Sequence, residues 1–314
     1  MYLTVLIPMF NEAQTIVPLM SAVVRSCRRM GITFEILAVN DGSTDQTWTL
    51  ARQFREDYSD VRIRLVHLQT NQGKGACLQA GMCLAEGEWV VIQDADLEYD
   101  PIDYKTMLEA TERFNADIVY GSRFLAREAV STFWHRGGNR VLTDISNWCT
   151  GFDLTDVHTG LKLFRGTLIR GIALEEKRFG FCPEITAKLA KMGATNDSKS
   201  NRSSWRQNAV GVASDRAYRL TEVAVSYRPR TKREGKKIGW VDGLRAVWCS
   251  VWYTWLSRRP ETTDPNFVVV VDSGDVLFDS FQQVASSESC VPKVCGRESG
   301  GSAVAPRELV RNED

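Results

Sequence analysis

Long apolar runs, paired cysteines and histidine metal clusters are all missing from this 314-residue chain. No run approaches the roughly 20 apolar residues of a membrane-spanning helix, so we expect the chain not to cross a bilayer unaided. The eight cysteines form no C-x-x-C pair and mostly lie in apolar segments, which favours reduced thiols in a cytosolic setting. Neither His135 nor His158 has a third ligand at metal-binding spacing, so no histidine metal site is predicted.

The amino-terminal residues also lack a basic stretch, and they reach Pro8 too early for a secretory leader. We interpret them as a first strand. With 43% hydrophobic residues the chain can bury a full core, which excludes disorder of the whole. The formal charge is zero, yet residues 260–314 hold ten acidic and four basic side chains. Residues 1–259 therefore carry a surplus of six positive charges, which favours anionic partners such as phosphates or acidic lipid head groups.

Apolar strands and amphipathic helices alternate along the first 120 residues with short connections. Strands are predicted at 3–7, 34–39, 62–68, 89–93 and 117–120, and helices between them end near residues 30, 58, 85 and 114. This alternation is typical of a Rossmann-like α/β fold, a doubly wound and mostly parallel sheet with helices on both faces. Ligands of such sheets bind beyond the carboxyl ends of the strands.

Four polar clusters fall at those carboxyl ends, in residues 8–12, 40–45, 71–75 and 94–98. They would line one crevice, which predicts a nucleotide site. Asn11 and either Ser43 or Thr44 are interpreted as caps of the helices that follow them. The segment around Lys74 lacks P-loop spacing, so this lysine either meets a phosphate near its helix start or is simply solvated.

The fourth cluster places three carboxylates two residues apart, directly after an apolar strand. In extended chain, Asp94, Asp96 and Glu98 lie on one face and repel each other unless a cation neutralises them. An all-oxygen site of this kind suits Mg²⁺ or Mn²⁺. The alternative is that the three acids only solvate a loop.

Taken together, the ordered motifs resemble glycosyltransferase family 2, the inverting GT-A enzymes, and within it the polyprenyl-phosphate sugar transferases typified by dolichyl-phosphate mannose synthase. The motifs are P-M-F-N-E at 8–12, N-D-G-S-T-D at 40–45, N-Q-G-K-G at 71–75, D-A-D-L-E at 94–98 and G-S-R at 121–123. The similarity continues to about residue 258. It implies a GT-A fold with a C-terminal amphipathic helix.

The resemblance also implies roles for the matched residues. Those expected against the base and ribose of a nucleotide-sugar are Pro8, Phe10, Glu12 and Asp41. Asp94 and Asp96 would meet the ribose, the diphosphate and the metal, and Glu98 would complete the metal shell. Arg123 would face the phosphates with a basic residue of the run 230–237, such as Arg230 or Lys236, since a guanidinium binds phosphate oxygens in pairs. The predicted catalytic residues are therefore Asp94, Asp96 and Arg123.

The implied reaction moves mannose or glucose from GDP-mannose or UDP-glucose to a dolichyl-type polyprenyl phosphate, with inversion and with Mg²⁺ or Mn²⁺. A lipid phosphate is already anionic, so this acceptor would need no strong general base. One alternative keeps the donor chemistry with a glycan hydroxyl or a glycerolipid as acceptor. Another is a nucleotide-sugar-binding protein without turnover. No nucleic-acid partner is expected.

Residues 1–230 are predicted to form the transferase domain, with a donor half at 1–120 and an acceptor half at 121–230. A polar stretch at 195–216 departs from the family pattern and is interpreted as a disordered insertion. His158 also departs from it, which puts its role in doubt. The segment 133–140 either lies beside the acceptor phosphate or is an ordinary helix start.

Residues 231–259 combine a basic approach with a Trp-rich stripe at helical spacing, as an interfacial helix does. The alternative is a stripe packed on the domain's own core. We expect attachment to the cytosolic face of a membrane, the endoplasmic reticulum or a bacterial inner membrane, either peripherally or through an anchoring partner subunit. Residues 260–314 are expected to be disordered apart from one stray strand at 267–271.

Overall fold

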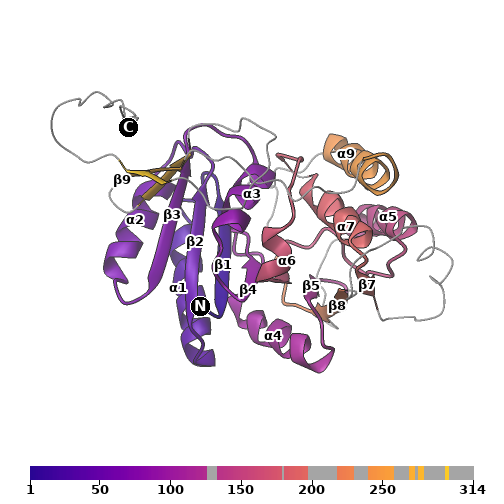
Figure 1. Ribbon diagram of the computed structural model, residues 1–314, viewed down its shortest axis with the longest axis horizontal. Coiled ribbons are helices and arrows are strands. Elements are labelled where there is room, and N and C mark those ends of the chain that lie inside the picture. The colour runs from indigo at the N-terminus through magenta and orange to yellow at the C-terminus, as the bar shows by residue number, and fades with distance from the viewer. Residues whose placement is uncertain are drawn as a thin grey trace, which may run out of the picture.

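A computed structural model describes residues 1–125, 133–178, 180–196, 218–229 and 240–257, and the short stretches 269–272, 275–278 and 294–296. One twisted sheet runs through the molecule with helices on both of its faces (Figure 1). The strand order is β11-β9-β10-β3-β2-β1-β4-β6-β5-β8-β7. The doubly wound α/β fold predicted from the alternating pattern is confirmed.

The strands that carry the predicted motifs are parallel neighbours. β1 (Leu3–Met9) pairs with β2 (Phe34–Asn40) and with β4 (Trp89–Ile92), and β2 pairs with β3 (Arg62–Leu68). Beyond β4, the antiparallel strand β6 (Lys162–Arg165) is followed by β5 (Ile118–Ser122), β8 (Arg219–Ala224) and the two-residue strand β7 (Thr195–Asn196). The carboxyl ends of β1 to β4 therefore share one edge.

Two apolar layers sandwich the sheet, because successive residues of its strands point to opposite faces. In β1, Leu6 packs into one layer, whereas Val5 and Ile7 pack into the other. The first layer is covered by α3 (Lys74–Leu84), α6 (Gly166–Arg170) and α7 (Phe181–Lys191). The second is covered by α1 (Ile16–Met30), α2 (Thr47–Asp57) and α4 (Tyr104–Arg113).

Two predicted helix caps are wrong. α1 begins only at Ile16, and the side chain of Asn11 instead accepts the Thr44 N–H at 2.9 Å. α2 begins at Thr47, whose N–H is accepted at 2.9 Å by Asp45. The polar residues of these two loops therefore bind each other across the gap between neighbouring strands, which local capping rules do not anticipate.

The C-terminal amphipathic segment forms α9 (Trp240–Val251) and a π-helical continuation at Trp252–Leu256. Its Cys249 and Tyr253 are buried against Ala187 of α7. The predicted Trp stripe lies on the other side of the helix, because Leu244, Trp248, Trp252 and Trp255 are all exposed. The alternative of a stripe packed on the core is therefore wrong for these four residues.

The helix α5 (Phe133–Thr150) lies beside α9 and α7 at the end of the molecule opposite β9 (Figure 1). Its exposed Trp148 meets Trp255 edge to face, with ring centroids 4.8 Å apart. Among the described helices, none has the length and apolarity to cross a bilayer.

Three short strands lie within the segment 260–314, which was predicted to be mostly disordered. β9 (Val269–Asp272), β10 (Asp275–Phe278) and β11 (Val294–Gly296) extend the sheet beyond β3, and β10 pairs with β3 in parallel. The single stray strand expected at 267–271 is thus one of three. Residues 197–216 of the predicted insertion, and the basic run with Arg230 and Lys236, lie outside the described residues.

Candidate functional site

The first two motifs are held together by hydrogen bonds between the loops after β1 and β2. Ser43 Oγ accepts the N–H of Asn11 at 3.0 Å, and Thr47 Oγ1 accepts the N–H of Glu12 at 2.7 Å. Of the predicted donor-site residues here, Pro8 is buried inside β1, whereas Phe10 and Glu12 are half-buried just beyond it. The structure therefore brings these two motifs to one edge of the sheet, as predicted.

Asp41 joins this edge to the third motif. Its carboxylate accepts the N–H groups of Gln72 and Gly73 at 2.7 and 2.8 Å, and the side-chain amide of Asn71 at 3.0 Å. Burial raises the pKa of Asp41, and these hydrogen bonds partly oppose that shift. The carboxylate expected to hold the nucleoside thus also fixes the loop that leads into α3.

Lys74, the first residue of α3, points into the site and is not solvated. Its ammonium forms an ion pair with Oδ1 of Asp94 and lies 4.9 Å from the ring centroid of Phe181. Gly73 has φ of +101°, where an L side chain would be strained, and an added Cβ would overlap the carbonyl oxygen of Lys177. The tight approach at Gly73 therefore aims Lys74 at Asp94.

The three predicted metal ligands do not lie on one face. Leu97 has φ of +60°, so the chain turns left-handed between Asp96 and Glu98 instead of continuing extended. The Glu98 carboxylate accepts the hydroxyl of Tyr227 at 3.1 Å. Within the described ranges, no three Asp, Glu, His or Cys side chains are grouped closely enough to hold a metal ion. The role of Glu98 in a metal shell stays a prediction, and in this structure its carboxylate is paired with Tyr227.

Arg123, at the end of β5, has its guanidinium fork engaged by an internal partner. Its Nε and Nη2 donate to the two oxygens of Asp156 at 2.6 and 2.8 Å. Glu222 in turn accepts the N–H of Asp156 at 3.0 Å. Burial alone would lower the pKa of Arg123, but the nearby acidic groups raise it. The fork predicted to bind phosphate oxygens is thus bound to Asp156 in this structure.

Tyr227 and Gly160 connect the Arg123 pair to the carboxylate motif. The Tyr227 ring centroid lies 5.2 Å from the Arg123 guanidinium carbon, while its hydroxyl contacts Glu98. An added Cβ at Gly160 would overlap Oδ2 of Asp94, so this backbone lies directly against that carboxylate. The residues from Asp94 to Glu98 therefore lie close to Arg123, and this group of side chains at the edge of the sheet is called the crevice.

Two basic groups of the 156–164 segment, the buried Lys162 and the half-buried His158, are close to this crevice. Lys162 donates to the carbonyl oxygen of Thr159 and lies 3.5 Å from Sγ of Cys182. Burial lowers the pKa of Lys162. Burial, with the charge of Lys162, also lowers the pKa of His158 to about 4, so this imidazole is neutral at neutral pH.

Several of these contacts were not predicted from the sequence. Lys74 was expected to meet a phosphate or solvent, whereas it pairs with Asp94. For Asp156, the only signal was its place in the 156–164 segment. No sequence pattern marked Tyr227. These three residues acquire their partners through contacts between chain segments far apart in sequence.

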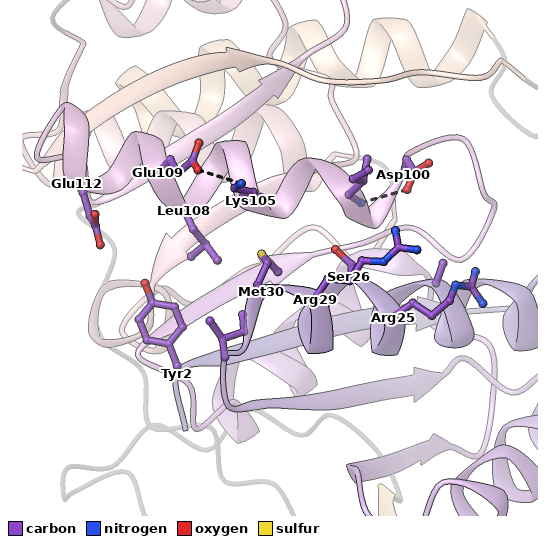
Figure 2. Close-up of a pocket in the computed structure, with 13 residues that line it drawn as sticks. Tyr2, Arg25, Ser26, Arg29, Met30, Asp100, Lys105, Leu108, Glu109 and Glu112 are labelled. Carbon is purple, nitrogen blue, oxygen red and sulfur yellow. Dashed lines mark hydrogen bonds and ion pairs between the residues drawn. The ribbon is translucent and has the colours of Figure 1, made fainter.

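A hollow of about 720 Å³ lies away from these residues, between α1 and α4 (Figure 2). Its lining includes Tyr2 and Met30 near the amino ends of β1 and β2, and the ion pair between Lys105 and Glu109. None of the residues predicted to contact substrate or metal lines it. The hollow is therefore not the site that the motifs define.

The fold and the crevice define a glycosyltransferase of the GT-A type. Residues 4–172 match the family model described as "Glycosyl transferase family 2", which is more than half of the chain, so the chain belongs to this family. The family resemblance predicted from the motifs is confirmed.

Particular relatives are similar over part of their length. The chain is 30% identical over 213 residues to dodecaprenyl-phosphate galacturonate synthase of Rhizobium johnstonii, covering 63% of this chain and 59% of the relative. It is 25% identical over 190 residues to undecaprenyl-phosphate 4-deoxy-4-formamido-L-arabinose transferase of Edwardsiella ictaluri, covering 60% and 57%. The match thus spans less than two thirds of these relatives.

Among solved structures, glucosyl-3-phosphoglycerate synthase of Mycobacterium tuberculosis, in complex with Mn²⁺, UDP-glucose and phosphoglyceric acid, is similar with a TM-score of 0.52. The identity is 13%, and the alignment covers 85% of this chain and 83% of that one. At this identity the likeness supports the fold alone.

Proposed function

We propose that this protein transfers a sugar from a nucleoside diphosphate to a polyprenyl phosphate at a membrane surface, using a divalent metal ion. The observation that carries the proposal is the shared edge of β1 to β4, where all four amino-terminal motifs of the family meet. The relatives named above are described as acting on polyprenyl phosphates, which supports this acceptor.

The carboxylate motif suits a hard divalent cation. Asp94 and Asp96 supply oxygen donors, and Mg²⁺ or Mn²⁺ is commonly bound by one or two carboxylates plus substrate phosphates. Asp94 is already matched with a positive charge, that of Lys74, which fits a position built for a cation. A bound metal would stabilise the negative charge that develops on the leaving nucleoside diphosphate.

The remaining groups of the crevice would bind and orient the substrates. The ammonium of Lys74, at the start of α3, is suited to the diphosphate, because an ammonium pairs with phosphate oxygens. Arg123 remains a proposed phosphate-binding group, and its charge is balanced by Asp156 in this structure. An acceptor phosphate is anionic near neutral pH, so its oxygen can attack the anomeric carbon without a strong base. Inversion at that carbon follows from the family.

The surface formed by α5 and α9 supports attachment to a membrane. Trp148, Trp248, Trp252 and Trp255 are exposed there, and Trp248 stacks on Trp252 with centroids 5.3 Å apart. Exposed tryptophans of this density suit the boundary between lipid head groups and acyl chains. The inner side of α5 reaches the crevice, since Thr143 Oγ1 accepts the N–H of Val157 at 3.4 Å. A lipid-linked acceptor would therefore arrive on the side of the crevice that these helices border.

The test is transfer of radiolabelled sugar to polyprenyl phosphate in detergent with Mn²⁺, with and without EDTA. GDP-mannose and UDP-glucose are the proposed donors, and UDP-galacturonic acid is added because a relative is described as a galacturonate synthase. EDTA-sensitive lipid-linked product from one donor would support the class and identify the sugar. Asp96→Ala should lower that transfer by at least about 100-fold while its thermal midpoint stays close to wild type. Donor hydrolysis without lipid product would overturn the acceptor assignment.

A further inference from the structure

Lys74 occupies the position on Asp94 where a metal ion would need to bind. Its ammonium forms an ion pair with Oδ1, while the backbone at Gly160 lies directly against Oδ2 of the same carboxylate. Oδ1 of Asp94 is therefore paired with the ammonium, while Oδ2 has the chain on one side and the side chain is 20% exposed. A divalent cation that binds Oδ1 must displace the ammonium.

The ammonium and the Asp94 carboxylate are opposite charges in direct contact, so the ion pair already compensates the charge of Asp94. The ammonium of Lys74 also lies over the face of Phe181, 4.9 Å from the ring centroid. A divalent cation beside an undisplaced ammonium would be strongly repelled, since both are positive and little water separates them.

A nucleoside diphosphate offers Lys74 another partner. Lys74 is the first residue of α3, and phosphates bind at helix amino termini. Movement of the ammonium from Asp94 to a diphosphate oxygen would keep its charge compensated and would expose Oδ1. The diphosphate itself would then provide further oxygen ligands for the metal.

We infer that Lys74 acts as a resident counter-ion that blocks metal binding at Asp94 until a nucleoside diphosphate draws it away. The inference rests on the proposed function, because it assumes that donor and metal share this crevice. It makes the two binding events positively coupled, and the coupling is reciprocal: the metal tightens nucleotide binding by the same factor. Lys74 is thus a positioning residue that sets the order in which the site is filled.

The experiment measures Mn²⁺ binding to the full chain by electron paramagnetic resonance of free Mn²⁺, without nucleotide and with GDP or UDP. Wild type should bind Mn²⁺ weakly alone and at least about tenfold more tightly with the matching nucleotide. Lys74→Met keeps the apolar stem and removes the charge, so it should bind Mn²⁺ at least about tenfold more tightly than wild type without nucleotide. Lys74→Arg keeps a positive charge beside Asp94 and should bind Mn²⁺ as weakly as wild type.

Lys105→Met is the matched control, because Lys105 is an exposed lysine paired with Glu109 on α4. It should leave both Mn²⁺ affinities unchanged. Circular dichroism and thermal midpoints establish that each variant is folded before its affinity is compared. Equal or weaker nucleotide-free Mn²⁺ binding by folded Lys74→Met would overturn the inference, even if the transfer assay succeeded. Absence of Mn²⁺ binding by wild type and Lys74→Met, with and without either nucleotide, would overturn the inference and the metal assignment together.

Discussion

The ion pair between Arg123 and Asp156 offers a quantitative test of how the crevice is built. Its side chains are 14% and 0% exposed, and two parallel hydrogen bonds join them. Asp156→Asn preserves the shape of the side chain but leaves the guanidinium without a compensating charge. Breaking a buried pair in this way costs about 3 to 5 kcal/mol, and because the amide can still accept one hydrogen bond we expect about 3 kcal/mol.

Urea unfolding followed by tryptophan fluorescence measures this loss directly. A loss of about 3 kcal/mol corresponds to a fall of about 6 to 10 °C in the thermal midpoint of a domain of this size. The matched control is Asp144→Asn, which breaks a pair with Arg140 whose side chains are 60% and 56% exposed. An exposed pair of this kind contributes about 0.5 kcal/mol or less.

A double-mutant cycle separates the pair from other effects of each change. Arg123→Met alone leaves Asp156 as a buried carboxylate without its cationic partner. In the Asp156→Asn background, the same change leaves no charged side chain without its partner. We expect a coupling free energy of about 2 kcal/mol. If Asp156→Asn cost no more than Asp144→Asn, or if the coupling were absent, burial would not be what makes this pair strong and the reasoning would be refuted.

Two further predictions concern the α5–α9 surface and His158. Trp148→Ser with Trp255→Ser removes a ring pair that is 61% and 48% exposed, and should lower co-sedimentation with anionic vesicles by at least about fivefold. Ile102→Ser changes a similarly exposed residue (56%) outside α5 and α9 and should leave co-sedimentation unchanged. If this control and the double tryptophan variant lost equal co-sedimentation, binding would not be specific to the α5–α9 surface. Because burial holds the pKa of His158 at about 4, the unfolded chain binds the extra proton first as pH falls from 6.5. The free energy of unfolding should therefore fall by roughly 1 to 3 kcal/mol as the pH is lowered from 6.5 to 4. If the free energy of unfolding depended on pH equally in wild type and in His158→Gln, this prediction would be contradicted.

Much of the donor side of the fold followed from local sequence pattern. The strands from Leu3–Met9 to Ile118–Ser122 were predicted within two residues at most ends, because apolar strands alternating with amphipathic helices carry their own periodicity. The meeting of the four motifs at one edge followed from the same pattern, since parallel strands with short connections align their carboxyl ends. Helix caps were predicted less well, because the polar residues of two neighbouring loops had partners in each other.

The sequence by itself thus determined the family, the strands of the donor half and the chemical type of each motif. Only the tertiary structure decided which charges compensate which. The left-handed turn at Leu97 directs Glu98 toward Tyr227, and packing across the sheet sets Lys74 against Asp94 and Arg123 against Asp156. These pairs join segments 20 to 129 residues apart, so no local periodicity encodes them. They exist because burial forces each charged group to find a partner among the side chains that the completed fold brings within reach.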